Sequence, residues 1–202
     1  MTPEDVATFE RCISVGGVAL FPADTVYGLA TEPDSREGFE RLYALKGRPP
    51  LRPSAVMFFQ LELALASLPE LGPGTRAAFE RLLPGPVTLL LPNPVRRFPL
   101  ACGPTPETLG MRVPALTGAL EPLGAARWPV LQSSANPSGG ADARRLADVD
   151  PRIRAEVDLE LDAGDLPGTP STVVDLATYE ETGRYEVLRG GALTAEQLRD
   201  AL

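Results

Sequence analysis

The chain of 202 residues contains no histidine. Histidine is the commonest general base in enzymes and the commonest protein ligand of transition metals. Its absence excludes Ser-His-Asp and Cys-His catalysis and every histidine-zinc site. Any reaction that this protein catalyses must therefore proceed without an imidazole.

Cysteine and long apolar runs are also scarce. The two cysteines, Cys12 and Cys102, lie far apart and show no metal-binding spacing, so we expect free thiols. No apolar run approaches the roughly 20 residues that a membrane-spanning helix needs. The acidic start, residues 1–5, has no signal-peptide pattern. These absences predict a cytoplasmic protein without membrane contact.

Positive charge is carried almost entirely by arginine, and the single lysine is Lys46. Lys46, Arg48 and Arg52 share one proline-rich segment. An ammonium beside planar guanidinium groups suits a ligand that carries both phosphate and carboxylate. Alternatively, Lys46 is a helix-end cation and the segment is simply solvated. The net charge of −8 argues against broad electrostatic binding of nucleic acid but allows a local basic cleft.

Helical and strand patterns alternate along the whole chain. This alternation predicts one α/β domain over residues 1–202, in which helices flank a twisted mixed sheet. We expect helices at residues 2–15, 35–46, 62–68, 75–82, 116–123 and 143–149, and a last helix that begins at Thr194. We expect strands at residues 18–21, 54–59, 87–91, 108–113, 129–132, 157–161, 171–176 and 185–188.

Several segments at strand ends carry polar side chains. Residues 21–29 combine a carboxylate, a hydroxyl and a phenol that can orient a small polar substrate, although an ordinary turn has the same composition. Residues 133–140 offer N–H groups and hydroxyls that can cradle phosphate. They lack the Walker and Gly-x-Gly-x-x-Gly patterns, so a plain surface loop remains the alternative. Arg112, Ser171 and Arg189 add polar groups at other strand ends.

Seven short motifs, read in order, resemble the YrdC/YciO/Sua-type family. They are Pro-x-Asp-Thr-x-Tyr-Gly-Leu (22–29), Lys-x-Arg-Pro (46–49), Pro-Gly-Pro-x-Thr-Leu (84–89), Arg-Val-Pro (112–114), Ser-Ala-Asn-x-Ser-Gly (134–139), Ser-Thr-Val-Val-Asp (171–175) and Leu-Arg-x-Gly (188–191). The resemblance covers nearly the whole chain, from about residue 17 to residue 191. It is closest to the short, single-domain threonylcarbamoyl-AMP synthases and implies a YrdC-like fold with a concave, locally basic cleft.

The resemblance implies an L-threonylcarbamoyladenylate synthase, a nucleotidyltransferase that uses L-threonine, bicarbonate and ATP with Mg²⁺. Its product, threonylcarbamoyl-AMP, would pass to partner proteins that make threonylcarbamoyladenosine in tRNA. The implied ATP-binding residues are Arg48, Arg52, Thr108, Ser134, Asn136, Asp142 and Arg189. The implied threonine-binding residues are Thr25, Arg112, Gln132 and Ser171, the implied catalytic residues are Lys46 and Arg48, and no protein ligand of a metal is implied. A carbamate is already an anion, so this chemistry suits a chain without histidine.

Three departures from the family pattern leave alternatives open. Ala23 stands where threonine is usual, residues 52–54 replace Asn-Pro-Leu, and Met57 stands where some relatives carry histidine. One alternative is a YrdC-like paralogue that uses another substrate. The other is a non-catalytic protein that binds tRNA or double-stranded RNA through the arginines of the cleft.

Overall fold

The computed structural model describes all 202 residues and contains nine strands. They are β1 (Ala19–Pro22), β2 (Tyr27–Thr31), β3 (Ala55–Met57), β4 (Val87–Pro92), β5 (Thr108–Arg112), β6 (Val130–Ser134), β7 (Leu159–Glu160), β8 (Thr172–Asp175) and β9 (Glu186–Arg189). They form one sheet in the order β7-β1-β2-β6-β3-β5-β4-β8-β9. The pairs β1/β7, β3/β5 and β4/β8 are parallel and the other pairs are antiparallel. The predicted mixed sheet is therefore confirmed.

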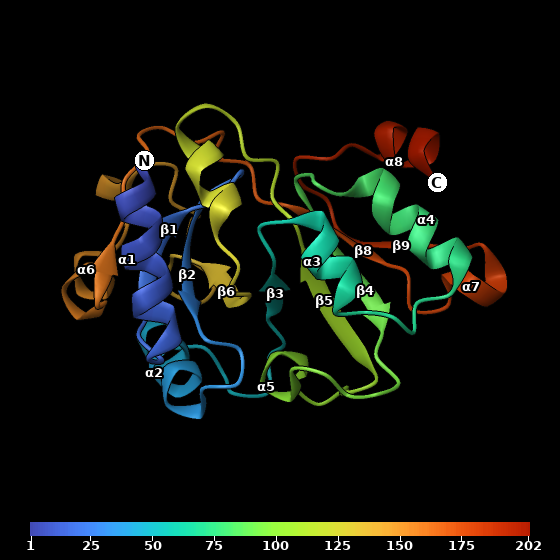
Figure 1. Cartoon of the computed structure of the whole chain (residues 1–202), viewed down its shortest axis with the longest axis horizontal. Coiled ribbons are helices and arrows are strands. Elements are labelled where there is room, and N and C mark those ends of the chain that lie inside the picture. Colours follow the sequence, from blue (N-terminus) through green and yellow to red (C-terminus); the bar gives the residue numbers. More distant parts are fainter.

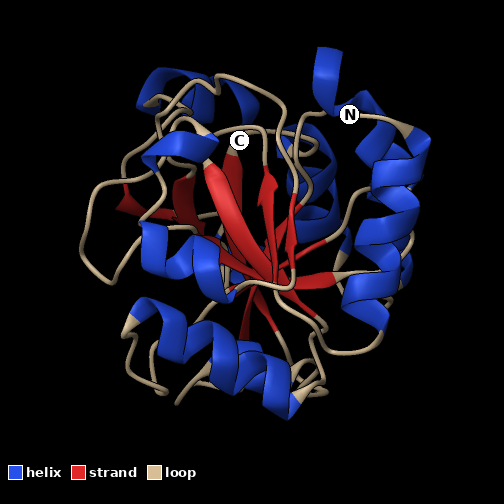
Figure 2. Cartoon of the chain, turned by 90° about the vertical axis from the view of Figure 1, so that its left-hand side faces the viewer, coloured by secondary structure: helices blue, strands red, loops and turns tan.

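Helices surround this sheet, as the view of Figure 2 shows. The α-helices are α1 (Pro3–Ser14), α2 (Arg36–Lys46), α3 (Leu61–Ala66), α4 (Pro73–Leu82), α5 (Pro99–Cys102), α6 (Pro151–Glu156), α7 (Tyr179–Thr182) and α8 (Ala195–Ala201). Two 3-10 helices are η1 (Gly118–Ala125) and η2 (Leu146–Asp148). In Figure 1, α1 and α2 lie beside β1 and β2, whereas α4, α7 and α8 cover the opposite end of the sheet.

Apolar residues of several elements form one buried core around the sheet. Phe9 of α1 packs against Phe21 of β1 at 5.4 Å between ring centroids and against Phe59 at 5.7 Å. All three side chains are buried, and burial of each large aromatic ring stabilises the fold by about 2–3 kcal/mol. This cluster fixes α1 against the sheet near the start of the chain.

The ends of α2 set the course of the first site segment. Ser35 caps its start, because its Oγ accepts a hydrogen bond from the backbone N–H of Gly38 at 3.1 Å. Gly47 follows its last residue with φ of 57°, a left-handed conformation that glycine adopts without a Cβ clash. The helix therefore ends at Lys46, and the chain turns there toward Arg48.

Some predicted elements differ from the structure. The helix predicted at 116–123 is wrong in type: a 3-10 helix forms, and Pro122 inside it cannot donate the hydrogen bond that an α-helix needs. The helix predicted at 143–149 is reduced to the short η2. Strand β2 and the short helices α5, α6 and α7 were not predicted. No helix of the structure has both the length and the apolar character needed to cross a membrane.

Candidate functional site

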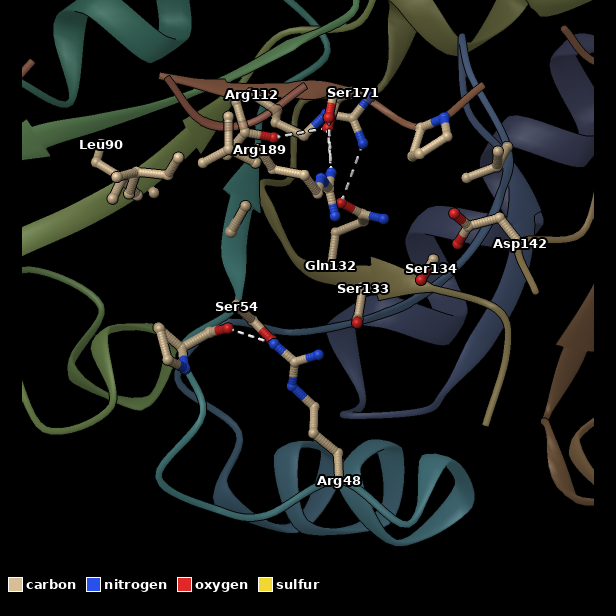
Figure 3. A pocket seen from close by; sticks show the side chains of 18 residues that line it. Arg48, Ser54, Leu90, Arg112, Gln132, Ser133, Ser134, Asp142, Ser171 and Arg189 are labelled. Atoms are coloured by element: carbon tan, nitrogen blue, oxygen red, sulfur yellow. Dashed lines mark hydrogen bonds between the residues drawn. The ribbon is translucent and has the colours of Figure 1, made fainter. Parts of the chain in front are cut away.

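A cavity of about 290 Å³ opens over one face of the sheet. Figure 3 shows Arg112, Ser171 and Arg189 together on one side of it, with Arg48 on the other side and Ser134 and Asp142 on its flank. The predicted site residues that line the cavity are Arg48, Arg112, Gln132, Ser134, Asp142, Ser171 and Arg189. The lining thus carries three arginines and a single carboxylate, which suits an anionic ligand.

Arg112, the last residue of β5, is held by partners on two sides. Its Nη2 donates to Oδ1 of Asp24 at 2.7 Å and to Oγ1 of Thr25 at 3.2 Å. Its Nη1 donates to Oε1 of Gln132 at 3.4 Å, whereas its Nε is buried without a partner. Burial lowers the pKa of Arg112, and the charge of Asp24 acts in the opposite direction. Thr25 itself lies behind Arg112 and does not line the cavity.

Arg189, at the end of β9, lies against the start of β8. Its Nη2 donates to the backbone carbonyl of Ser171 at 2.7 Å and to Ser171 Oγ at 3.2 Å. Ser171 Oγ also shares a hydrogen bond with Thr88 Oγ1 at 2.9 Å. Gly191 permits this approach, because a Cβ there would lie 2.3 Å from the carbonyl oxygen of Pro170. The last two motifs of the sequence, at residues 171–175 and 188–191, therefore meet at one wall of the cavity.

Lys46 lies beneath the segment of residues 134–140, and its side chain is buried. Its Nζ donates to the backbone carbonyls of Ser134 and Asn136 and to Asn136 Oδ1. Burial lowers the pKa of Lys46 to about 8, and Arg48 acts in the same direction. All three N–H bonds of the ammonium thus reach protein acceptors in this structure. The catalytic role that the family resemblance implies for Lys46 stays a prediction.

Asn136 organises the same segment, which we call the serine loop (residues 134–140). Its Oδ1 accepts from Ser134 Oγ at 2.5 Å, and its Nδ2 donates to the carbonyl of Gly140 at 2.5 Å. The backbone N–H of Ser138 donates to the carbonyl of Lys46 at 2.7 Å. These contacts fix the serine loop at the end of α2 and place the Ser134 side chain in the cavity lining.

Arg48 is half-buried and rests on an aromatic ring. Its guanidinium carbon lies 5.4 Å from the ring centroid of Tyr43, within the range of a cation–π contact. Its Nη2 donates to the carbonyl of Pro53, and its Nε is buried without a partner. The Tyr43 hydroxyl donates to the carbonyl of Arg52 at 2.6 Å and shares a hydrogen bond with Ser54 Oγ at 2.8 Å. Tyr43 therefore anchors the segment that carries Arg48.

Three predicted ATP-binding residues lie outside the cavity lining: Arg52, Thr108 and Asn136. Arg52 is exposed on the segment after Arg48. Thr108 begins β5 and its Oγ1 donates to the carbonyl of Thr105 at 3.2 Å. Met57, whose position distinguishes this chain from some relatives, is fully buried beside Arg112 in the β3/β5 register. The carbonyl of Arg52 accepts from Tyr43, but the side chains of Arg52 and Thr108 form no hydrogen bond with the other site residues.

Asp24 and Tyr43 are site residues that sequence reasoning did not select. The first motif offers the carboxylate of Asp24 as one of three groups that can orient a small polar substrate, but the family resemblance assigns it no binding role. Tyr43 carried no polar signal, because its position on the apolar side of a helix predicts only core packing. No group of three or more histidine, cysteine, aspartate or glutamate side chains is placed to hold a metal ion.

Comparison with known proteins finds relatives that match most of the chain. The Sua5/YciO/YrdC family, described as telomere recombination, matches residues 11–191. The threonylcarbamoyl-AMP synthase of Chromohalobacter salexigens is 34% identical over 188 residues, which are 91% of this chain and 98% of the relative. The threonylcarbamoyl-AMP synthase of Hahella chejuensis is 32% identical over 168 residues, which are 82% of this chain and 90% of the relative.

Longer relatives match as well. The threonylcarbamoyl-AMP synthase of Pyrococcus abyssi is 29% identical over 194 residues, which are 94% of this chain but only 55% of that protein. The structure of P. abyssi Sua5 complexed with L-threonine superposes with a TM-score of 0.81 at 26% identity, covering 100% of this chain and 58% of Sua5. E. coli YciO superposes with a TM-score of 0.76 at 24% identity, covering 98% and 94% of the two chains, and supports the fold alone. Because the family match extends over most of its length, the chain belongs to the Sua5/YciO/YrdC family.

Proposed function

We propose that the chain is an L-threonylcarbamoyladenylate synthase that converts L-threonine, bicarbonate and ATP into threonylcarbamoyl-AMP and pyrophosphate. The observation that carries this proposal is the convergence of Arg48, Arg112 and Arg189 on one cavity with a single carboxylate. The names of the relatives and the threonine complex of P. abyssi Sua5 support it. The chain matches only 55% of that P. abyssi protein. The activity of the longer protein is therefore stated for this chain as a proposal.

The reaction needs two anionic groups to meet. The amine of threonine combines with carbon dioxide derived from bicarbonate, loses a proton and becomes a carbamate. One carbamate oxygen then forms a bond to the α-phosphorus of ATP, the bond to the β-phosphate oxygen breaks, and pyrophosphate leaves. Since both reactants carry negative charge, the protein's main contributions are orientation and positive charge. No imidazole is required, which agrees with a chain that has no histidine.

The two sides of the cavity suit these two reactants. Arg112 has a buried, unpartnered Nε and can bind the carboxylate of an amino acid, with Thr25, Gln132 and Ser171 around it. Arg48, whose Nε is also unpartnered, lies across the cavity and can bind phosphate. Ser134 and Asn136 shape the serine loop between them, with Lys46 beneath it. In this assignment Lys46 positions the serine loop, and its positive charge favours binding of phosphate on the other side of the loop.

The donor set of the cavity is compatible with Mg²⁺ that arrives on ATP. Magnesium in nucleotide sites takes one or two carboxylates together with substrate phosphates and water. Asp142, the single carboxylate of the lining, would hold it. Bound there, Mg²⁺ would neutralise charge on the phosphates. We further propose transfer of the product to partner proteins of tRNA modification in the cytoplasm; contact with tRNA or double-stranded RNA stays a prediction.

The test is pyrophosphate release from ATP, measured with and without bicarbonate and with each of several amino acids. Release that requires both bicarbonate and L-threonine is the expected result. Release that requires bicarbonate and a different amino acid would replace threonine with that substrate. ATP-independent, salt-sensitive binding of RNA without pyrophosphate release would instead support the non-catalytic alternative.

A further inference from the structure

Asp24 and Arg112 form a buried ion pair that joins two distant parts of the chain. Asp24 lies in the turn between β1 and β2, and Arg112 ends β5. The side chains of both residues are only 4% exposed, and Oδ1 of Asp24 lies 2.7 Å from Nη2 of Arg112. An ion pair at this depth is costly unless its geometry is well satisfied, and removal of one partner leaves a buried charge.

The second oxygen of Asp24 is also occupied. Oδ2 accepts a hydrogen bond from the backbone N–H of Ala115 at 3.1 Å. Ala115 follows Arg112 by three positions. The Asp24 carboxylate therefore accepts hydrogen bonds from both the Arg112 guanidinium and the backbone just beyond β5. The carboxylate thereby has no freedom to rotate without losing one of the two contacts.

Arg112 has one remaining unsatisfied donor. Its Nε is buried and lacks a partner, and Gln132 is held only at 3.4 Å. A buried N–H without a partner is unfavourable, and a ligand oxygen at this position would supply the missing acceptor. Asp24 and Thr25 occupy Nη2 and Gln132 occupies Nη1, which leaves the Nε N–H as the unpartnered donor for a ligand oxygen.

We propose that Asp24 is a positioning residue that sets the orientation of the Arg112 guanidinium and thereby determines recognition of the substrate carboxylate. It acts through Arg112 and does not itself touch the substrate. This inference rests on the proposed function, because it takes the ligand of Arg112 to be the carboxylate of an amino acid.

The decisive comparison uses L-threonine and L-threoninamide, which lacks the carboxylate. We expect wild-type protein to prefer threonine in kcat/KM, and Asp24→Asn to lower that preference by about tenfold or more. The KM for ATP should change by less than about twofold, since Arg48 lies across the cavity. A merely structural defect would lower turnover of both compounds together and leave their ratio unchanged.

Asp158 provides a control with the same types of contact in a more exposed pair, since its side chain is 43% exposed. Its Oδ2 accepts from the backbone N–H of Val18 at 2.7 Å and from Nη1 of Arg41 at 2.9 Å, so it combines an arginine with a backbone contact as Asp24 does. It does not line the cavity. Asp158→Asn should leave the threonine-to-threoninamide ratio at its wild-type value. An equal change in this variant would overturn the proposal.

A double-mutant cycle covers the case in which Asp24→Asn folds poorly. Combined with Arg112→Gln it removes both buried charges, so the double variant no longer contains an unpaired ion. If Asp24 acts through Arg112, adding Asp24→Asn to Arg112→Gln has no further effect on the threonine-to-threoninamide ratio. Additive effects, or an unchanged ratio in Asp24→Asn, would refute the positioning role. Wild-type protein that releases no pyrophosphate with any amino acid would instead contradict the proposed function itself.

Discussion

The ammonium group of Lys46 donates hydrogen bonds to the backbone carbonyl of Asn136 at 2.6 Å and to its side-chain Oδ1 at 3.0 Å. Asn136 in turn accepts from Ser134 Oγ and donates to the carbonyl of Gly140. The only lysine of the chain is the last residue of α2, and its buried ammonium holds the serine loop through these contacts.

Replacement of Lys46 by methionine should loosen the serine loop. The change keeps an unbranched side chain, one heavy atom shorter, but leaves the carbonyls of Ser134 and Asn136 without their buried donor. We expect Lys46→Met to lower the free energy of unfolding by about 1–3 kcal/mol and to weaken ATP binding by about tenfold. Chemical denaturation and calorimetric titration with ATP measure the two effects. Unchanged ATP affinity would show that the loop keeps its shape without Lys46.

The lowered pKa of Lys46 predicts a pH dependence of stability. Burial lowers this pKa from 10.5 to about 8, so between pH 8 and pH 10.5 the unfolded chain binds the proton more tightly than the folded protein. The contribution of Lys46 to the free energy of unfolding should therefore rise with pH across this window and be constant below it. The difference in unfolding free energy between wild type and Lys46→Met, measured from pH 7 to pH 10, isolates this contribution. A difference that falls with pH would mean that the folded-state pKa is raised.

Arg48→Ala should abolish most ATP-dependent turnover and leave the fold intact. Arg48 lines the cavity, is half-buried and belongs to a loop, so its removal opens no core cavity. Circular dichroism tests whether the fold is intact, and pyrophosphate release tests whether turnover is lost. Arg81, exposed in the last turn of α4, offers a matched control, and Arg81→Ala should retain full activity. Near-normal turnover of Arg48→Ala would remove Arg48 from the site.

Tyr43→Phe should disturb the loop that carries Arg48 without altering the aromatic ring beneath it. The hydroxyl bonds to the carbonyl of Arg52 and to Ser54 Oγ, whereas the ring contacts Arg48. We expect a loss of about 1 kcal/mol in stability and a rise of several-fold in the KM for ATP. Tyr43→Leu, which also removes the ring, should raise this KM further. Equal KM values for the two variants would mean that the cation–π contact contributes nothing.

Much of the fold was predictable from local pattern, because capping residues and breakers mark element ends directly. The capped helices beginning at Pro3 and Arg36 and the apolar strand at Ala19 follow from such signals. Strand β2 was missed because Gly28 interrupts its apolar pattern, and glycine weakens a strand signal. The structure shows why a glycine stands there: a Cβ would lie 3.0 Å from Nε2 of Gln132 on the neighbouring strand.

Polar groups at strand ends indicated candidate segments of the site, and the family resemblance then assigned roles to individual residues. Arg48, Arg112, Ser134 and Arg189 were selected in this way, and the structure brings all four to one cavity. The pairing of Asp24 with Arg112 was not predictable, since it depends on long-range contact between strands of the folded sheet. Lys46 illustrates the same limit: the sequence showed an isolated ammonium, but its burial under the serine loop follows from tertiary packing.

The lining of the cavity begins at Val26 and ends at Arg189, with contributions from β3, β4, β5, β6, β8 and β9. No short segment of the chain therefore contains the whole lining. If the protein were divided between β5 and β6, neither piece would contain the whole lining until both had reassociated along the sheet. A complete cavity thus requires the completed sheet. Measured ligand binding would therefore report whether the sheet has assembled correctly.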